Sequence, residues 1–363
     1  MTGPLLVPPA LAPVVLPADV PPEVRSRLAG SGTLLPPFTD AHVHLGLVDP
    51  APLRSRGVAA VHDLGGTPAD VAALAGDPAL PRVAYAGAFL TAPGGYPSDR
   101  AWAPAGWVEE VASPADAVAA VDRQVAAGAS FVKVALHADA GPTPDDATLA
   151  AVVDRAHAHG RDVVAHAEGP GQAARAFAAG VDRLAHAPFS ERLPDELLVA
   201  MATRGTTGGS RTPGPLTWLS TLDIHGWGSP TPEREVALDN VRRFAVAGGR
   251  VRYGTDLGNG PLPVGLNARE LAALAAAGLG RRSLLQALVG DEPPAGLVSF
   301  VPGPAPAQAD VGAVHAAWLA RAVVLDLADL RDPAFVPPTA TDQPADQPAD
   351  QPADQPAEPG GAA

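Results

Sequence analysis

Short apolar runs alternate with alanine-rich helical stretches along most of this chain of 363 residues. The helical stretches carry start and stop signals. For one helix we expect Thr143 as the N-cap and Pro144 at the first helical position, with Asp145 and Asp146 against the helix dipole, and Gly160 ends it. Strand–helix units that repeat about eight times with short loops predict a parallel (β/α)8 barrel, also called a TIM barrel. A doubly wound sheet is the alternative, but no glycine-rich phosphate loop follows the first predicted strand.

The predicted strands share an apolar interior and a polar or glycine-rich end. They cover residues 37–44, 58–63, 82–89, 130–136, 162–168, 182–187, 205–210 and 250–256. The seventh is the weakest of these, because a glycine-rich segment such as 205–210 rarely forms a strand interior. We therefore expect the barrel to extend over residues 37–300.

The formal net charge is −14, and five of the acidic residues lie after Val336. This acidic balance excludes nucleic acid and anionic membranes as main partners. Disulfides and thiolate ligands are excluded because the chain has no cysteine, so a metal site must use histidine, carboxylate or modified lysine. No run approaches the roughly 18 apolar residues of a spanning helix, and residues 1–20 lack the charged start of a signal peptide. We expect a soluble, cytoplasmic protein with a small-molecule substrate, and a homo-oligomer remains open.

The end of the chain has a different composition. Between residues 336 and 363 the unit Asp-Gln-Pro-Ala repeats four times and is followed by Glu-Pro-Gly-Gly-Ala-Ala. This acidic, proline-spaced segment has nothing to bury, so we predict that residues 336–363 form a disordered tail.

A single lysine, Lys133, occurs among the 25 basic side chains, and all the others are arginine. It lies in the apolar run 130–136. A guanidinium stays protonated, whereas a desolvated lysine amine can lose its proton and react as a nucleophile or base. The amine can also combine with carbon dioxide to give a carbamate, which is able to bridge two metal ions. A lysine that snorkels from a strand end is the alternative.

Side chains that can bind metal gather at the ends of five predicted strands. In a parallel barrel these ends form the mouth that holds catalytic residues. Because residues two apart on a strand share a face, His42 and His44 can chelate one ion. The six candidate ligands are His42, His44, Lys133, His166, His186 and Asp256. A satisfied buried histidine explains any one of these histidines, but it does not explain the register of the whole set.

The segments that carry these residues resemble the amidohydrolase superfamily of metal-dependent hydrolases. The matching segments are Phe38-Thr-Asp-Ala-His-Val-His-Leu45, Gly57-Val-Ala-Ala-Val-His-Asp-Leu-Gly65, Gly128-Ala-Ser-Phe-Val-Lys-Val134, Val164-Ala-His-Ala167, Leu184-Ala-His186 and Gly254-Thr-Asp256. The resemblance implies that His42 and His44 bind the more buried metal. It also implies that carbamylated Lys133 bridges to a second ion, which His166 and His186 hold. Asp256 would bind the first metal and shuttle the proton.

The resemblance also implies a reaction, in which a metal-bridging hydroxide attacks a carbonyl or related centre. We expect hydrolysis of an amide-type C–N bond in a dipeptide, N-acyl compound, cyclic amide or carbamate. The expected cofactors are two divalent metal ions and carbon dioxide for Lys133. Zinc is expected, with manganese, cobalt and nickel as alternatives because ligand preferences overlap. Two other interpretations remain: a mononuclear deaminase or an esterase or phosphoesterase on the same barrel, and a non-catalytic binding relative.

Many members of the superfamily also build a β-rich second domain from the segments that flank the barrel. Here residues 1–36 are short and proline-rich, while residues 301–335 contain the strand-like runs 309–311 and 322–326. We therefore expect a small, reduced accessory β domain formed by these two flanking segments.

Other polar residues near strand ends are candidates for substrate binding. Tyr96 lies in a glycine- and proline-rich loop, and His137 follows the lone lysine by four residues. Arg211 and His225 follow the seventh predicted strand and can hold an anionic group. The predicted substrate-binding residues are Tyr96, His137 and Arg211.

Two acids at strand ends, Asp63 and Glu168, have simpler interpretations than catalysis. Asp63 closes the second predicted strand and is expected to accept hydrogen bonds rather than to catalyse. Glu168 shares a strand face with His166, where a carboxylate can contribute to the pocket. A solvated strand-end acid is the simpler interpretation of Glu168.

Overall fold

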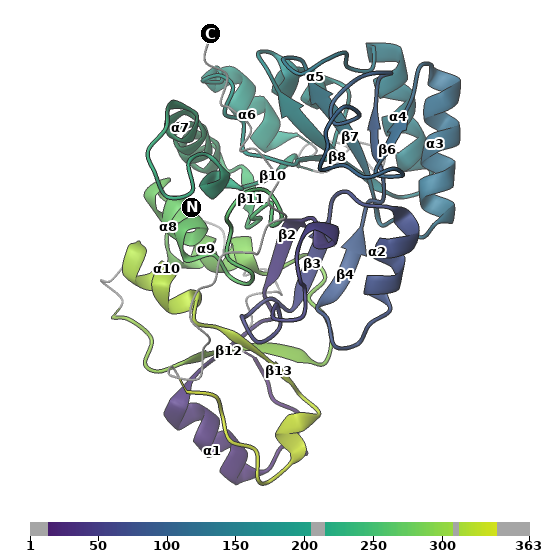
Figure 1. The fold of residues 1–363 in the computed structure, drawn as a ribbon. Coiled ribbons are helices and arrows are strands. Elements are labelled where there is room, and N and C mark those ends of the chain that lie inside the picture. The colour runs from purple at the N-terminus through teal and green to yellow at the C-terminus, as the bar shows by residue number, and fades with distance from the viewer. Residues whose placement is uncertain (1–13, 205–214, 308–311, 340–363) are drawn as a thin grey trace.

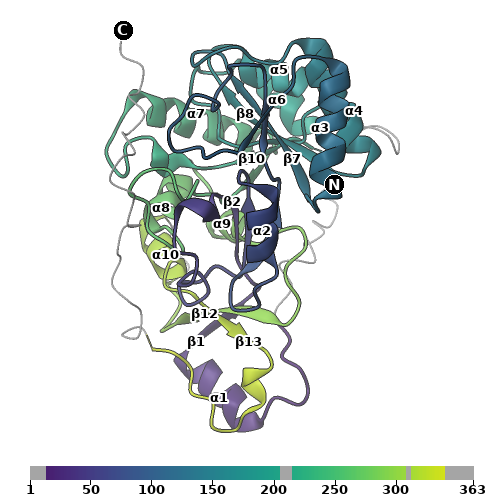
Figure 2. The same cartoon turned by 45° about the vertical axis from the view of Figure 1, so that its right-hand side comes forward.

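The computed structural model describes residues 14–204, 215–307 and 312–339. Parallel strands with helices around them form the larger part, and a small antiparallel sheet with helix α1 lies at one end of the molecule, away from helices α3–α6 (Figures 1 and 2). The predicted seventh strand at 205–210 and the run 309–311 lie outside the described residues, as does residue 340 onward of the predicted tail.

The strands of the barrel pair in parallel throughout. They are β2 (Thr39–Val43), β3 (Ala60–Asp63), β4 (Arg82–Tyr85), β5 (Phe89–Thr91), β7 (Phe131–His137), β8 (Asp162–Glu168), β9 (Arg183–Leu184), β10 (Thr217–Leu219) and β11 (Arg250–Arg252). β4 pairs with β3 and β5 pairs with β7, so these two short strands share the third position of the barrel. Gly87 lies between them with φ 76°, a conformation that favours glycine. The predicted strand 82–89 is therefore interrupted.

Backbone hydrogen bonds close the barrel where the strand ladders stop. The N–H of Ser130 donates to the carbonyl of Tyr85 at 2.7 Å and joins β4 to the start of β7. The N–H of Asp256 donates to the carbonyl of His42 at 2.8 Å and joins the segment after β11 to β2. These contacts complete a ring of eight strand positions, which confirms the predicted (β/α)8 barrel.

The helices of the barrel follow the strands in chain order. They are α2 (Pro68–Ala75), α3 (Pro114–Ala126), α4 (Asp146–Ala158), α5 (Gln172–Ala178), α6 (Asp195–Thr203), α7 (Pro232–Val246), α8 (Ala268–Ala276) and α9 (Arg281–Leu288). The prediction that Thr143 caps helix α4 is wrong. Asp145 is the N-cap, because its carboxylate accepts a hydrogen bond from the N–H of Thr148 at 2.7 Å.

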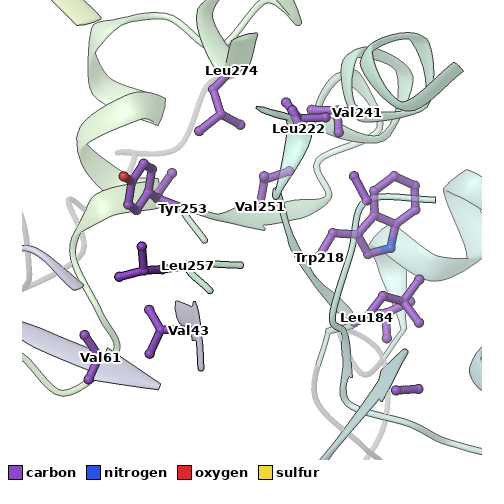
Figure 3. Packing of buried hydrophobic residues seen from close by; sticks show 14 of the residues in the cluster. Val43, Val61, Leu184, Trp218, Leu222, Val241, Val251, Tyr253, Leu257 and Leu274 are labelled. Carbon is purple, nitrogen blue, oxygen red and sulfur yellow. The ribbon is translucent and has the colours of Figure 1, made fainter. Parts of the chain in front are cut away.

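The main core lies between the strands and the surrounding helices. Trp218 of β10 stacks on Phe244 of α7, with ring centroids 3.9 Å apart, and both side chains are fully buried. Val251 of β11 and Val241 of α7 belong to the same cluster (Figure 3). A separate cluster of mostly small side chains fills the barrel interior. The interior is therefore packed below the strand ends, and the polar residues lie at its mouth.

The accessory sheet is antiparallel and combines a strand that precedes the barrel with two strands near or after its end. It consists of β1 (Gly32–Leu35), β12 (Leu297–Pro302) and β13 (Val323–Asp326), with α1 (Pro22–Ser31) against it and α10 (Ala313–Leu319) on α8. The predicted run 322–326 contributes β13. β12 begins at Leu297, so the accessory sheet starts inside the range expected for the barrel. No helix of the described segments is long and apolar enough to cross a membrane.

Candidate metal centre

His42, His44 and Asp256 converge at the carboxyl ends of neighbouring barrel strands. His42 lies in β2, His44 follows it, and Asp256 follows β11. The Oδ1 atom of Asp256 lies 3.0 Å from Nε2 of His42 and 3.2 Å from Nε2 of His44. All three side chains are buried. The structure thus brings together the three residues predicted for the first metal.

The other ring nitrogens show which tautomer each histidine adopts. Nδ1 of His42 lies 2.8 Å from the carbonyl oxygen of Ala185, and Nδ1 of His44 lies 3.1 Å from that of Gly65. A carbonyl oxygen only accepts hydrogen bonds, so both Nδ1 atoms carry the proton and both Nε2 atoms present lone pairs. Burial lowers the pKa of His42 to about 4, although the charge of Asp256 partly offsets this, so the ring is neutral near pH 7.

The electrostatics of this cluster fit a bound cation. Although burial works to raise the pKa of Asp256, this pKa is held well below its usual value, so the carboxylate is ionised. Nε2 of His42 has no hydrogen-bond partner among the described residues. Two imidazole lone pairs and one carboxylate oxygen therefore face a common point, and the ligand atoms lie within 4.8 Å of one another. Buried acceptors in this arrangement repel one another unless a cation lies among them.

Asp256 is held in an uncommon backbone conformation. Its φ of 61° lies in the left-handed region, which costs a non-glycine residue on the order of 1–3 kcal/mol. The amide of Asn259 donates to its Oδ2 atom at 2.9 Å, so Oδ1 remains directed at the histidines. The surrounding hydrogen bonds thus maintain a strained residue at the point where its carboxylate meets both imidazoles.

Asp40 supports this cluster and was not singled out from the sequence. Its carboxylate accepts hydrogen bonds from the backbone N–H groups of His42 at 3.1 Å and Thr255 at 3.0 Å, and from the Thr255 hydroxyl. Burial raises the pKa of Asp40 to about 7 despite these bonds. Asp40 thus ties β2 to the segment that carries Asp256. The sequence signal that could have identified Asp40 is an aspartate two residues before the His-x-His segment.

His166 of β8 and His186 after β9 form a second pair of converging nitrogens. Nδ1 of His166 lies 3.0 Å from Nε2 of His186. Nε2 of His166 lies 3.0 Å from a carboxylate oxygen of Glu168, so Nε2 carries the proton and Nδ1 presents a lone pair. Nδ1 of His186 lies 2.9 Å from the hydroxyl of Thr221. When that Nδ1 donates to the hydroxyl, His186 offers Nε2 as a second ligand atom beside Nδ1 of His166.

The interpretation of Glu168 as a solvated strand-end acid is wrong. Besides His166, its Oε2 atom lies 3.3 Å from Nε2 of His137, because His137 is its direct partner in the β7–β8 ladder. Burial works to raise the pKa of Glu168, but the hydrogen bond and charge of His166 lower it overall. Carboxylates that hold a ligating histidine by its distal nitrogen fix the ring orientation. His137, His166 and Glu168 also place ligand atoms within 4.8 Å of one another.

Lys133 is buried, so it does not snorkel to the surface. It shares a face of β7 with Phe131, which packs in the barrel interior, and its Nζ atom lies 5.5 Å from the ring centroid of Phe89. Burial lowers its pKa from 10.5 to about 8, while the charges of Asp256 and Asp63 partly offset the effect. The amine of Lys133 therefore interacts electrostatically with Asp256 of the candidate metal ligands, and it loses its proton more readily than an ordinary lysine.

Asp63 accepts hydrogen bonds, as expected from the sequence. Its two carboxylate oxygens accept from the backbone N–H groups of Leu45 at 2.8 Å and Gly65 at 3.1 Å. Gly65 in turn offers its carbonyl to His44. Asp63 thus supports the candidate metal ligands through the turn that holds His44.

The predicted substrate-binding residues lie in different situations. The ring of Tyr96 stacks on His166 with centroids 5.1 Å apart and lies 4.9 Å from the ring of His137, so both predicted residues adjoin the second pair. Arg211 lies outside the described residues. His225 is buried, and its ring lies 4.2 Å from that of Phe189.

Comparison with known proteins gives relatives in sequence and in structure. No family model matches the chain. Proteins described as uncharacterized from Mycobacterium bovis and Mycobacterium tuberculosis are 28% identical over 294 residues, which cover 72% of this chain and 73% of each relative.

Solved structures of several hydrolases have a similar fold. A Xaa-Pro dipeptidase with bound methionine in its active site has a TM-score of 0.62 at 20% identity, over 82% of this chain and 86% of its own. The ochratoxinase of A. niger has a TM-score of 0.63 at 18% identity, over 81% and 82%. An amidohydrolase has a TM-score of 0.60 at 19% identity, over 82% and 86%. The resemblance found in the sequence is therefore confirmed as a shared fold.

Proposed function

We propose that this protein is a metal-dependent hydrolase of the amidohydrolase superfamily that cleaves an amide-type C–N bond of a small molecule. The observation that carries the proposal is the convergence of two imidazole nitrogens and an ionised carboxylate at His42, His44 and Asp256. The proteins of similar fold support the reaction class, because they include a dipeptidase and an amidohydrolase.

Two divalent metal ions fit the residues present. His42, His44 and Asp256 would hold the first ion, and His166 and His186 would hold the second. Such ions lower the pKa of bound water and polarise a substrate carbonyl. Imidazole and carboxylate ligands favour zinc, with manganese, cobalt and nickel as alternatives. Zinc and the cytoplasmic location remain predictions.

Lys133 would complete the pair as a carbamate. Its pKa of about 8 leaves roughly one amine in ten neutral at pH 7, and the neutral amine is the form that attacks carbon dioxide. The neutral nitrogen bonds to the carbon of carbon dioxide and releases one proton, which gives an anion. Counted from the protonated lysine, two protons are released and a cation becomes an anion. That anion restores charge balance beside two metal ions, which a protonated lysine would oppose.

Asp256 would move the proton of the reaction. Its carboxylate is ionised, and the amide of Asn259 restrains Oδ2 while leaving that atom a second lone pair. It can accept a proton from the attacking water and return it to the leaving nitrogen, which would otherwise depart as an unstable anion. The fixed geometry of Asp256 keeps this acceptor beside the reacting centre.

The test is an activity screen of metal-loaded protein over N-acyl amino acids, dipeptides, cyclic amides, esters and phosphoesters. We expect amide hydrolysis that Asp256→Asn reduces by about 10²- to 10⁴-fold, which is the usual contribution of an acid–base group. Asp154→Asn, on the exposed face of α4, serves as the control and should retain activity. Hydrolysis of esters or phosphoesters alone would contradict the proposed bond type. Full metal loading with no hydrolysis would instead indicate a binding protein.

A further inference from the structure

Five aromatic side chains surround the candidate metal ligands, in a chain that has 16 aromatic residues in all. They are Phe89, Tyr96, Trp102, Trp107 and Phe189. The first four come from residues 89–107, which run from β5 to the outer strand β6 (Val108–Glu110). The fifth follows β9. Since aromatic residues are only 4% of the sequence, this is a strong local concentration.

Two of these rings form a support behind His44. The rings of Phe89 and Trp107 stack on His44 with centroids 5.6 Å and 6.3 Å away. Both side chains are buried, with 3% and 5% of their surface exposed. A Cβ at Gly65 would come within 2.1 Å of the Phe89 ring, so this packing requires glycine there. Phe89 and Trp107 therefore hold His44 and have little surface left for a ligand.

The other three rings are half-buried and lie by the second histidine pair. Tyr96 stacks on His166, and Phe189 lies 6.5 Å from His186. The ring of Trp102 lies 6.1 Å from Tyr96. Because Tyr96, Trp102 and Phe189 each keep some exposed surface, a bound molecule can cover them. Each histidine of the pair thus has a partly exposed aromatic ring beside it, Tyr96 at His166 and Phe189 at His186.

We propose that the substrate carries an aromatic or similarly bulky apolar ring next to the scissile C–N bond, and that Tyr96, Trp102 and Phe189 bind this ring. The proposal rests on the proposed function, because it assigns the substrate class of the same site. Aromatic rings gain from covering one another at centroid distances of about 4.5–7 Å, the range already seen among these side chains. A small acyl group would leave the exposed surface of these three rings in contact with water, and the stabilisation from ring contacts would be lost.

A pair of substrates that differ by one phenyl ring tests the proposal. N-(phenylacetyl)glycine and N-acetylglycine contain the same amide bond. For the metal-loaded wild-type chain we expect kcat/KM to be about 10- to 100-fold higher for the phenylacetyl compound, as expected when one ring is buried against aromatic side chains. Trp102→Ala and Phe189→Ala should reduce that ratio towards one. Trp102→Phe retains a ring and should preserve most of it.

A matched control replaces an aromatic ring elsewhere. Phe177 of α5 is also half-buried, but its ring lies against Arg204 rather than the metal ligands. Phe177→Ala should leave the ratio unchanged. A ratio that stays high in both Trp102→Ala and Phe189→Ala would overturn the assignment of these rings.

Binding measurements separate this proposal from the proposed function. Calorimetry of the metal-loaded chain with phenylacetate and with acetate measures the preference for the ring without any reaction. Preferential phenylacetate binding that Trp102→Ala weakens, with no hydrolysis of either substrate, would support the aromatic site and contradict the hydrolase. Hydrolysis of both substrates at equal kcat/KM, with equal binding of the two acids, would overturn the aromatic site and retain the hydrolase. Absence of both hydrolysis and preferential binding would overturn both.

Discussion

Carbon dioxide should react with Lys133 of the metal-free protein, and the rate should depend on pH because only the neutral amine reacts. The pKa of this amine is far below that of an ordinary lysine. Burial lowers the pKa of Lys133 from 10.5 to about 8. At pH 7 the neutral fraction is therefore roughly one in ten, against roughly one in three thousand for an unshifted lysine, a difference of about 300-fold. The rate of carbamate formation should rise about tenfold from pH 6 to pH 7 and level off above about pH 8.

The assay starts from chelator-treated protein and uses ¹³C-labelled carbon dioxide. Dissolved carbon dioxide is held at one concentration at every pH, because its ratio to bicarbonate changes with pH. Added zinc traps the carbamate, and its ¹³C signal gives the initial rate. Lys133→Arg is the control, since a guanidinium forms no carbamate and should give no signal. A rate that keeps rising tenfold per pH unit through pH 9 would refute the argument from burial, and an unlabelled wild-type protein would refute carbamylation itself.

Three other substitutions test the residues that support the site and the packing of the core. Glu168→Gln should weaken binding of the second ion by about 10- to 100-fold, because the amide no longer fixes its histidine as an ionised carboxylate does, and unchanged affinity in equilibrium dialysis would contradict this role. Gly65→Ala should lower the affinity for the first ion, since its Cβ would come within 2.1 Å of the Phe89 ring, whereas Gly30→Ala meets open space and should not; equal affinities in the two variants would contradict the packing argument. Trp218→Ala should reduce the free energy of unfolding by about 3–5 kcal/mol in a denaturant titration, and a loss below about 1 kcal/mol would show that its stacked ring is not central to the core.

The positions of most candidate ligands could be predicted because they lie near or just beyond a strand end, whereas Lys133 is the third of seven residues in β7. In a parallel barrel this end is shared by all strands, so local periodicity in sequence becomes proximity in space. His42 and His44 show the simplest case, two residues apart on one strand face. To place Asp256 beside His42, the prediction also needed the segment after β11 to lie next to β2. The repetition of about eight strand–helix units implied this closure.

The groups that orient the ligands could not be predicted in the same way. The Nδ1 atoms of His42 and His44 meet backbone carbonyls of Ala185 and Gly65, and a carbonyl has no side-chain signature in the sequence. Glu168 was misinterpreted because its role depends on the histidines that the β7–β8 register places beside it.

Strand boundaries were less predictable than strand existence. β10 occupies Thr217–Leu219, and a strand of only three residues is too short for a periodic signal. The path of residues 89–107 was also not predictable, because loop aromatics have no periodicity that specifies which rings they meet. The accessible rings near His166 and His186 emerge only from the tertiary structure.

The central claim is that this barrel holds a pair of metal ions, and metal analysis of the purified chain tests it most directly. After reconstitution with zinc and bicarbonate, we expect about two ions per wild-type chain and about one in Lys133→Arg. One ion or none in the wild-type protein would contradict the two-metal site, and two ions in Lys133→Arg would contradict the bridging role of Lys133.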